Sequence, residues 1–262
     1  MHLEEIIKSV IKISLEAGAF IKEQRKTFSP QQIEFKGLND MVSYVDKTAE
    51  KMIVAALEEV LPEAGFITEE KTINKSGDRY NWIIDPLDGT TNFIHGLPVY
   101  SVSIALQEYD ELIIGVVYEI NQDECFYAWR GSPAYLNGKK IKVSGSPGIN
   151  NSLLATGFPY FDFSKQPAYI ALFTELMKSC HGLRRLGSAA VDLAYTACGR
   201  FDGYYEYNLN PWDVAAGILI VRQAGGEVVN FKRGAECLNS RELLATNGKI
   251  TDELLKIIQK HL

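Results

Sequence analysis

The sequence has few cysteines, and none of them are arranged as pairs. The chain of 262 residues holds four, Cys125, Cys180, Cys198 and Cys237, with no Cys-x-x-Cys motif. This spacing argues against a zinc site or a disulfide framework and favours free thiols in a reducing compartment. Repeats, low-complexity segments and linkers rich in Pro or Ser are also missing, which indicates an ordinary soluble globular protein.

The sequence also lacks an excess of positive charge. Lys and Arg number 27 against 33 Asp and Glu, so the formal net charge is -6. We therefore expect no nucleic-acid or anionic-lipid partner, and any phosphate group must be held locally. No apolar run approaches the length of a membrane span, and Glu4, Glu5 and Lys8 interrupt the first residues, so we expect neither a signal peptide nor membrane association. The sequence predicts a cytoplasmic protein.

Apolar residues make up 46 % of the chain, which is enough for a substantial core. Their spacing predicts a long amphipathic helix over residues 3–26 and a second helix that ends near residue 61. Short apolar runs at residues 101–106, 112–118 and 125–129 predict an antiparallel meander. From residue 152 on, strands and helices alternate. The order of elements predicts a layered α/β architecture, built as one large domain or two closely packed halves.

The stretch from Trp82 to Phe93 contains the most informative motif of the sequence. Its apolar start predicts a buried strand that stops at Pro86, because proline has no N–H to continue a ladder. Asp85 and Asp88 would leave that strand end together, and Gly89-Thr90-Thr91 follows with backbone N–H groups and hydroxyls. This pattern indicates a metal site beside a phosphate cradle. The competing interpretation is a solvated turn in which Asp and Gly are ordinary turn formers.

Further acidic residues stand at the boundaries of predicted elements. Glu69 and Glu70 follow a short strand at residues 65–68, which can end beside the strand that carries Asp85. Asp46 stands near the start of the second helix, where it can cap the helix and can also orient a neighbouring hydroxyl group. Asp213 lies in the first turn of a helix that Pro211 opens, where an acid also complements the helix dipole.

The chemistry that these residues predict is metal-assisted hydrolysis of a phosphate ester. Carboxylate ligands without a His or Cys cluster favour Mg²⁺, and four are available, Glu69, Asp85, Asp88 and Asp213. If Asp85 bridges two ions, one ion can lower the pKa of an attacking water while the other stabilises the leaving oxygen. Thr90 is placed to align that water, and Asp46 could accept the threonine proton.

Two separated motifs resemble one known family. The string from Trp82 to Phe93, together with Pro211-Trp212-Asp213-Val214-Ala215-Ala216-Gly217, is similar to the inositol monophosphatase family of Mg²⁺-dependent, lithium-sensitive phosphatases. The resemblance covers nearly the whole chain. It implies a mixed α/β (α+β) fold, the five-layered αβαβα sandwich of the inositol monophosphatase and fructose-1,6-bisphosphatase type. It also implies a homodimer that uses two or three Mg²⁺ ions, for which Mn²⁺ can substitute.

Within this fold we expect residues 1–262 to form one compact domain. Its metal-site half would cover about residues 1–145, and its second, α/β half about residues 146–262.

The resemblance also implies roles for individual residues. The ions would be held by the side chains of Glu69, Asp85, Asp88 and Asp213 and by the Leu87 carbonyl oxygen. Thr90 with Asp46, and Glu69 beside them, would activate the water. The substrate-binding positions would be Lys36, Asp88, Gly89, Thr90, Gly187, Ser188, Ala189, Glu206 and Asp213. Among these, Gly89 and Thr90 would bind the phosphate group, whereas the turn at residues 187–189 and Glu206 would contact the alcohol portion.

Some of these residues also have plain structural interpretations. Taken alone, Gly187 and Ser188 could bind an anion or a sugar hydroxyl at a helix start, but a tight turn with a helix cap explains them better, and a solvated surface lysine explains Lys36 better. The sequence departs from the family at Thr68, where Gly is common, and at Ser43, where Thr is common, but both changes leave the ligand types intact.

Several functions compete. The first is hydrolysis of a myo-inositol monophosphate to inositol and phosphate. The nearest rival is hydrolysis of another small phosphate monoester, such as 3′-phosphoadenosine 5′-phosphate, fructose 1,6-bisphosphate or NADP. Glu206 argues against the nucleotide, because a carboxylate suits polyol hydroxyls better than a second phosphate. A non-catalytic, partner-binding protein on the same fold is the third possibility, although all four carboxylates and Thr90 are present.

Overall fold

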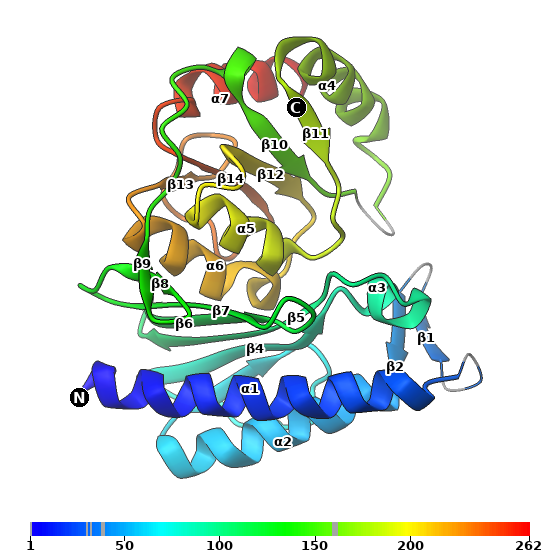
Figure 1. Cartoon of the computed structure of the whole chain (residues 1–262), viewed down its shortest axis with the longest axis vertical. Helices are drawn as coiled ribbons and strands as arrows, with labels where there is room; N and C mark the ends of the chain where they lie inside the picture. The colour runs from blue at the N-terminus through cyan, green and yellow to red at the C-terminus, as the bar shows by residue number, and fades with distance from the viewer. Residues whose placement is uncertain (1, 30, 32, 38–39, 159–161) are drawn as a thin grey trace.

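The chain folds into five layers that alternate helices and sheets (Figure 1). The structure is a computed structural model, and it describes residues 2–29, 31, 33–37, 40–158 and 162–262. From the N-terminal side the layers are a helix pair, a seven-stranded sheet, a second helix pair, a five-stranded sheet and a third helix pair. The predicted αβαβα sandwich is confirmed.

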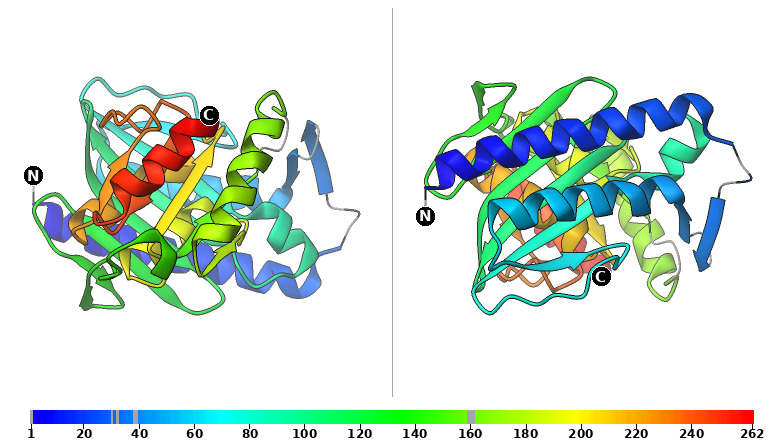
Figure 2. Two further views of the ribbon diagram at one scale, coloured as in Figure 1. Left: turned by 90° about the horizontal axis from the view of Figure 1, so that it is seen from above. Right: turned by 90° about the horizontal axis from the view of Figure 1, so that it is seen from below.

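The first layer consists of α1 (Leu3–Thr27) and α2 (Tyr44–Val60), which lie side by side across the outer face of the large sheet (Figure 2). Apolar residues three or four apart give each helix one buried face, as the sequence predicted. None of the helices in the described part of the chain has the length and apolar content needed to cross a membrane.

The large sheet has the strand order β3-β4-β5-β6-β7-β8-β9. Its strands are β3 (Gly65–Thr68), β4 (Tyr80–Asp88), β5 (Ser101–Glu108), β6 (Glu111–Glu119), β7 (Glu124–Trp129), β8 (Ala134–Leu136) and β9 (Lys139–Ile141). β3 and β4 are parallel, and each later pair is antiparallel, so the predicted meander is confirmed. The parallel pair brings the ends of β3 and β4 to the same edge of the sheet.

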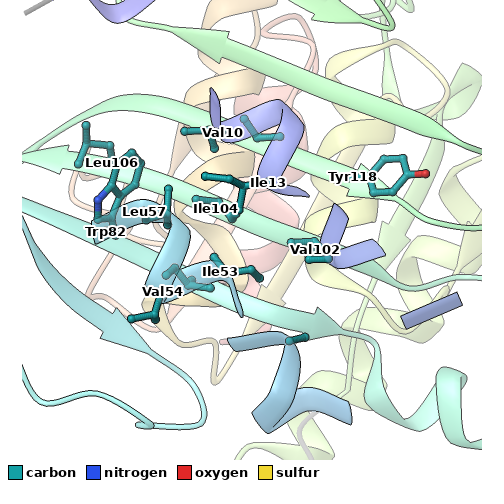
Figure 3. Packing of buried hydrophobic residues seen from close by; sticks show 14 of the residues in the cluster. Val10, Ile13, Ile53, Val54, Leu57, Trp82, Val102, Ile104, Leu106 and Tyr118 are labelled. Atoms are coloured by element: carbon teal, nitrogen blue, oxygen red, sulfur yellow. The ribbon is translucent and has the colours of Figure 1, made fainter. Parts of the chain in front are cut away.

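The core between the first two layers is mostly apolar. Val10 from α1 and Leu57 from α2 face Trp82 and Ile104 of the sheet, and all four side chains are inaccessible to solvent (Figure 3). Burial of each such side chain contributes roughly 1.5–3 kcal/mol. This packing fixes β4 from one side, so the residues at its end have a rigid support.

One expectation about β4 was wrong. The strand does not stop at Pro86 but continues to Asp88, with an irregularity in its pairing to β5. Asp85 lies opposite Ser103 and Asp88 lies opposite Ser101, so two residues of β4 between these pairs, Pro86 and Leu87, face a single residue of β5. This is a β-bulge, and a bulge tolerates a proline that cannot donate to the ladder.

The bulge also decides where the two aspartates point. In a regular strand, residues three apart face opposite sides of the sheet. Ser101 and Ser103 are two apart and share a face, so the extra residue in β4 puts Asp85 and Asp88 on one face as well. The two carboxylates can therefore enter the same cavity.

The second half builds a smaller sheet with the order β11-β10-β12-β14-β13. Its strands are β10 (Leu153–Thr156), β11 (Gly182–Arg184), β12 (Gly203–Tyr207), β13 (Glu227–Val229) and β14 (Glu242–Thr246). Outside it lie α4 (Gln166–Ser179) and α7 (Thr251–His261), while α5 (Ala189–Ala197) and α6 (Pro211–Gln223) form the middle layer (Figures 1 and 2).

α6 is the central helix of the molecule. Every residue from Val214 to Val221 is buried, because the helix is covered by α5 and by both sheets. Gly115 of β6 lies against it so closely that a Cβ atom there would come within 2.6 Å of the Ala216 carbonyl oxygen. A helix that is apolar on all sides fits this enclosed place.

Among the elements of the described residues, five short ones were not predicted from the sequence. These are the hairpin of β1 (Ile33–Gly37) and β2 (Asp40–Ser43), the helix α3 (Thr90–His95), the 3₁₀ turn η2 (Ile149–Asn151) and the strand β13. Each has six residues or fewer, so its periodicity is too short to identify.

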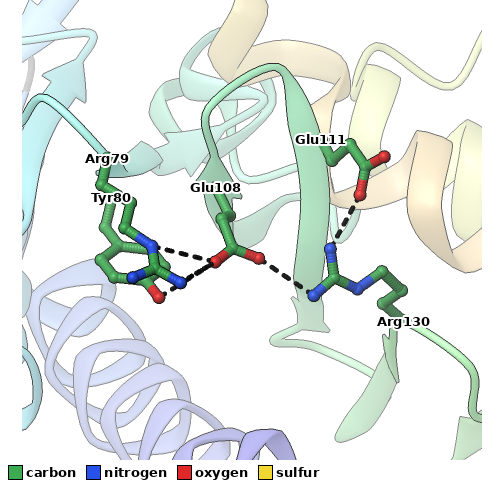
Figure 4. A network of polar contacts seen from close by, with 5 residues as sticks. All are labelled: Arg79, Tyr80, Glu108, Glu111 and Arg130. Atoms are coloured by element: carbon green, nitrogen blue, oxygen red, sulfur yellow. Dashed lines mark hydrogen bonds and ion pairs between the residues drawn. The ribbon is translucent and has the colours of Figure 1, made fainter. Parts of the chain in front are cut away.

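A polar network lies at one end of the large sheet, and Asp85 and Asp88 lie at the other end. Glu108 accepts hydrogen bonds from Arg79, Tyr80 and Arg130, and Arg130 also pairs with Glu111 (Figure 4). Hydrogen bonds lower the pKa of Glu108: the bond from the Arg79 guanidinium group has the largest effect, and the bond from the Tyr80 hydroxyl has the second largest. This network is at the surface and has no part in the cavity.

Candidate functional site

A cavity of about 400 Å³ opens where the ends of β3, β4 and β12 meet the first turns of α5 and α6. The sequence-predicted residues that line it are Glu69, Asp85, Leu87, Asp88, Gly89, Thr90, Gly187, Ser188, Ala189, Glu206 and Asp213. Glu69 lines the cavity, whereas Glu70 is not among the lining residues. Residues from five separate parts of the sequence therefore meet in one place.

Asp88 is held by the start of α5. Its Oδ2 accepts hydrogen bonds from the Ser188 hydroxyl at 2.5 Å and from the Ala190 N–H at 2.7 Å. Ser188 is also the N-cap of the helix and accepts from the Val191 N–H at 3.3 Å. The start of α5 therefore binds an anionic group of the same chain, the carboxylate of Asp88.

Thr90 and Asp46 are hydrogen-bonded to each other. The Thr90 hydroxyl lies 3.0 Å from Asp46 Oδ1 and 3.0 Å from the Leu87 carbonyl oxygen, so one proton is shared between two acceptors. Asp46 Oδ2 accepts from the Ser43 N–H and hydroxyl at 2.9 and 2.7 Å and completes a capping box at the start of α2. Asp46 therefore caps α2 and also binds the neighbouring Thr90 hydroxyl, so the two interpretations of this residue are compatible.

Gly89 links the strand to α3. Its φ angle is +95°, which disfavours a side chain, and a Cβ atom would meet the Val99 and Gly187 carbonyl oxygens at 3.0 and 3.3 Å. Glycine is needed here because the turn approaches the second half of the chain so closely.

Asp213 lies in the first turn of α6, opposite Asp88. Its Oδ2 accepts from the Asn210 N–H at 2.6 Å, which closes the capping box that starts the helix. Pro211 occupies the first turn, where its missing N–H costs nothing. The cap holds the Asp213 carboxylate at the cavity wall.

The carboxylates of the cavity destabilise one another's charged forms. Burial, followed by the charges of Glu69, Asp88 and Asp213, raises the pKa of Asp85 well above its usual range. Burial also raises the pKa of Asp88 to about 6 and that of Asp213 to about 7. A cation placed among these groups would remove this repulsion.

The carboxylates of the cavity are not yet grouped as metal ligands in this structure. Within the described part of the chain, no three His, Cys, Asp or Glu side chains are grouped so that they could hold a metal ion. The chemistry of the acidic side chains nevertheless fits a hard divalent cation, because Glu69, Asp88 and Asp213, whose charges act on Asp85, all offer carboxylate oxygens. The metal-binding role of these residues remains a prediction.

Glu206 forms the opposite wall of the cavity. The Tyr204 hydroxyl donates to its Oε2 at 2.6 Å, and burial raises the pKa of Glu206 to about 8. The carboxylate lies directly against Gly157, where a Cβ atom would come within 2.0 Å of its oxygens. Only glycine leaves room for this carboxylate.

Sequence reasoning missed several residues around the cavity. Asp192 of α5 and Arg185 line it, and Asn92 donates from Nδ2 to the Val99 and Leu186 carbonyl oxygens at 2.7 and 2.8 Å. Asn92 stood inside the central motif, but nothing in the sequence indicates a partner 94 residues away. Lys36 was predicted to contact substrate; it belongs to β1, and its side chain lies outside the described residues.

The fold and the cavity together define a layered α/β protein with an acidic pocket where strand ends meet helix starts. The match is specific: residues 2–262 match the inositol monophosphatase family, and the chain belongs to that family. The resemblance seen in the two motifs is therefore confirmed.

Individual relatives cover the whole chain. The protein is 36 % identical to an inositol-1-monophosphatase of Mesorhizobium japonicum over 100 % of this chain and 99 % of the relative. It is 38 % identical to the putative Nus factor SuhB of Neisseria meningitidis serogroup B, over 99 % of this chain and all of the relative. Among solved structures, the extragenic suppressor protein suhB of Bartonella henselae superimposes with a TM-score of 0.92 at 36 % identity, covering 98 % of this chain and 100 % of the other.

Proposed function

We propose that the chain hydrolyses a myo-inositol monophosphate to inositol and inorganic phosphate. The observation that carries the proposal is the meeting of Glu69, Asp85, Asp88 and Asp213 with the Thr90–Asp46 hydrogen bond in one cavity. The relative named inositol-1-monophosphatase supports it, because the two chains align over their whole lengths. The volume of about 400 Å³ is in the range that holds a small ligand.

In this proposal the carboxylates of Glu69, Asp85, Asp88 and Asp213 and the Leu87 carbonyl oxygen hold two or three Mg²⁺ ions, and Mn²⁺ could replace them. When bound, the metal supplies Lewis-acid stabilisation of the phosphate oxygens and lowers the pKa of a water molecule.

The chain's own groups would then guide the attack on phosphorus. The Thr90 hydroxyl accepts a proton from the water and passes its own proton to Asp46 Oδ1, with which it already shares a hydrogen bond. A bond forms from the water oxygen to phosphorus, and the bond from phosphorus to the ester oxygen breaks. The ester oxygen leaves with the bonding electron pair and takes a proton from solvent.

The alcohol portion would lie against the wall formed by Glu206 and residues 187–189. Glu206 can accept hydrogen bonds from polyol hydroxyls, and Tyr204 orients it for this role. Because the Ser188 hydroxyl already donates to Asp88, we assign it mainly to holding that carboxylate. Gly89 and Thr90 would face the phosphate group.

A specific observation favours a second substrate class. Arg185, Arg241 and Lys71 line the same cavity, so a second anionic group, as in fructose 1,6-bisphosphate, would find cations there. A phosphate-release assay with inositol 1-phosphate, 3′-phosphoadenosine 5′-phosphate, fructose 1,6-bisphosphate and NADP, each with Mg²⁺ and with chelator, tests the proposal. Preference for a bisphosphate would move the assignment to the second class, and absence of Mg²⁺-dependent release from all of them would overturn both.

Partner binding is a further candidate, because the Neisseria relative carries the name Nus factor. The intact set of acidic residues argues against partner binding as the sole function.

We also propose that the protein is a lithium-sensitive, cytoplasmic homodimer and that residues 1–262 form one domain. Light scattering tests the dimer, inhibition by LiCl tests the lithium sensitivity, and a single unfolding transition tests the domain.

A further inference from the structure

Glu50 is a buried acid that the mechanism above does not use. It lies in the middle of α2, its side chain is inaccessible to solvent, and it does not line the cavity. A carboxylate at such a place is costly unless hydrogen bonds replace its water. Its partners therefore indicate what it does.

Among the described residues, the hydrogen-bond partners of Glu50 come from the segment that carries Glu69. Oε2 accepts from the Glu70 N–H at 2.8 Å. Oε1 accepts from the Thr68 hydroxyl at 2.9 Å and from the Thr72 N–H and hydroxyl, each at 2.7 Å. Four hydrogen bonds are as many as one carboxylate accepts in common geometry.

These bonds enclose Glu69 without touching its side chain. Thr68 and Glu70 are its two neighbours in the chain, and both are tied to Glu50 of α2. On the other side, the Glu69 N–H donates to the Ile84 carbonyl oxygen of β4 at 3.3 Å. The backbone of Glu69 is thus held between α2 and the strand that carries Asp85.

We propose that Glu50 is a positioning residue that fixes the direction in which the Glu69 carboxylate enters the cavity, and thereby the affinity of the site for a divalent cation. This inference rests on the proposed function, because it takes Glu69 as a metal ligand. Glu50 acts through the peptide groups on either side of Glu69 and makes no contact with substrate.

The chemistry of the donors explains why a carboxylate is required. Two of the four partners are backbone N–H groups, which can only donate, so they need an acceptor. In Glu50→Gln the amide oxygen can keep the bonds to Thr68 and Thr72. The amide NH₂ group would then face the Glu70 N–H, donor against donor, and that bond would be lost.

The test is direct binding of Mn²⁺ alone, measured by isothermal titration calorimetry on the full chain, for wild type and Glu50→Gln. We expect the variant to bind Mn²⁺ about 10- to 100-fold more weakly, the usual effect of removing a group that orients a metal ligand. In activity assays the Mg²⁺ concentration for half-maximal rate should rise by a similar factor. At saturating Mg²⁺, the KM for inositol 1-phosphate should stay unchanged.

Asp202→Asn is the matched control. Asp202 is also a buried acid that ties two segments, since it accepts from the Leu153 N–H at 2.7 Å and from the Ser144 hydroxyl, but it does not line the cavity. It should lower the melting temperature without changing the Mn²⁺ affinity. If Glu50→Gln does not fold, Thr72→Val removes one of the four bonds at a half-buried position and should weaken Mn²⁺ binding in the same direction.

The outcomes separate the two hypotheses. If the folded variant binds Mn²⁺ as tightly as wild type, Glu50 is only a structural residue and the inference is wrong. A wild-type protein that neither binds Mn²⁺ nor requires Mg²⁺ would instead overturn the proposed function. Equal weakening in Asp202→Asn would show a general loss of stability and would also overturn the inference.

Discussion

The Ser188 hydroxyl donates to Asp88 Oδ2 at 2.5 Å, although 100 residues separate the two in the sequence. This bond joins the end of β4 in the large sheet to the first turn of α5 in the middle layer. With the bond from Asn92 to the Leu186 carbonyl oxygen, it fixes how the two halves meet. The cavity therefore exists only where both halves are folded and in contact.

Replacement of Asp88 by Asn should abolish turnover and leave the fold intact. The amide oxygen can still accept from Ser188 and Ala190, so the link to α5 survives, but the negative charge is lost. We expect kcat to fall on the order of 10³-fold, since metal-based charge stabilisation is worth several kcal/mol. Phosphate release and circular dichroism measure the two effects.

Glu108→Gln is the matched control for Asp88→Asn. It removes one negative charge at the opposite end of the same sheet, within the surface network of Arg79 and Arg130. It should leave kcat unchanged. If Asp88→Asn keeps wild-type activity, the metal assignment is wrong.

The catalytic rate should depend on the hydroxyl group of Thr90 and much less on its methyl group. Thr90→Val removes the proton shared with Asp46 and Leu87, so kcat should fall about 10²- to 10⁴-fold, the usual range for general acid–base catalysis. Thr90→Ser keeps the hydroxyl and should stay within about tenfold of wild type. Steady-state kinetics at saturating Mg²⁺ compare the pair, and equal activity of the Val and Ser variants would exclude the proton relay.

Glu206→Gln should change which alcohol is preferred more than how phosphate binds. The Gln oxygen can still accept from Tyr204, so the wall keeps its shape, but the charge-assisted bonds that Glu206 makes to polyol hydroxyls when it is ionised, at a pH above about 8, are lost. We expect kcat/KM for inositol 1-phosphate to fall about tenfold or more relative to fructose 1,6-bisphosphate. The inhibition constant of inorganic phosphate should change little. An unchanged ratio would remove Glu206 from the specificity of the site.

Metal-free protein should lose stability as the pH rises. Burial raises the pKa of Asp88 to about 6, that of Asp213 to about 7 and that of Glu206 to about 8. In the unfolded chain these carboxyls titrate near pH 4, so from about pH 4 to 8 the folded state binds more protons and its stability falls as the pH rises through each folded pKa.

The measurement is the melting temperature in EDTA and in Mg²⁺. In EDTA the melting temperature should fall between about pH 5 and pH 8, and Mg²⁺ should raise it most at the upper end, where the carboxylates are charged. A melting temperature in EDTA that rises over this interval would contradict the assigned burial of these groups.

The amino-acid sequence was sufficient for the long elements and for the residue types of the cavity. α1 and α2 have many turns of regular apolar spacing, and the predicted boundaries agree within a few residues. The bulge in β4 could not be predicted in the same way. Pro86 indicates an interruption, but only the pairing with β5 shows that the strand resumes after one extra residue.

Long-range contacts were the second feature that could not be predicted from the sequence. In the sequence, Glu50 is one of several charges on a helix, and its burial depends on where the segment after β3 lies. Likewise, the sequence indicates a tight turn with a helix cap at the start of α5, but it does not show that Asp88 of the same chain is bound there, which follows from how the layers stack. Local patterns identify candidate groups, whereas tertiary structure decides which of them meet.

Diffraction from a crystal soaked in Mn²⁺, with data collected at the manganese absorption edge, tests the central claim most directly. The account predicts anomalous density in the cavity, ligated by oxygens of Glu69, Asp85, Asp88 and Asp213, with the Leu87 carbonyl oxygen among the ligands. An empty cavity, with these carboxylates still apart at saturating Mn²⁺, would contradict it.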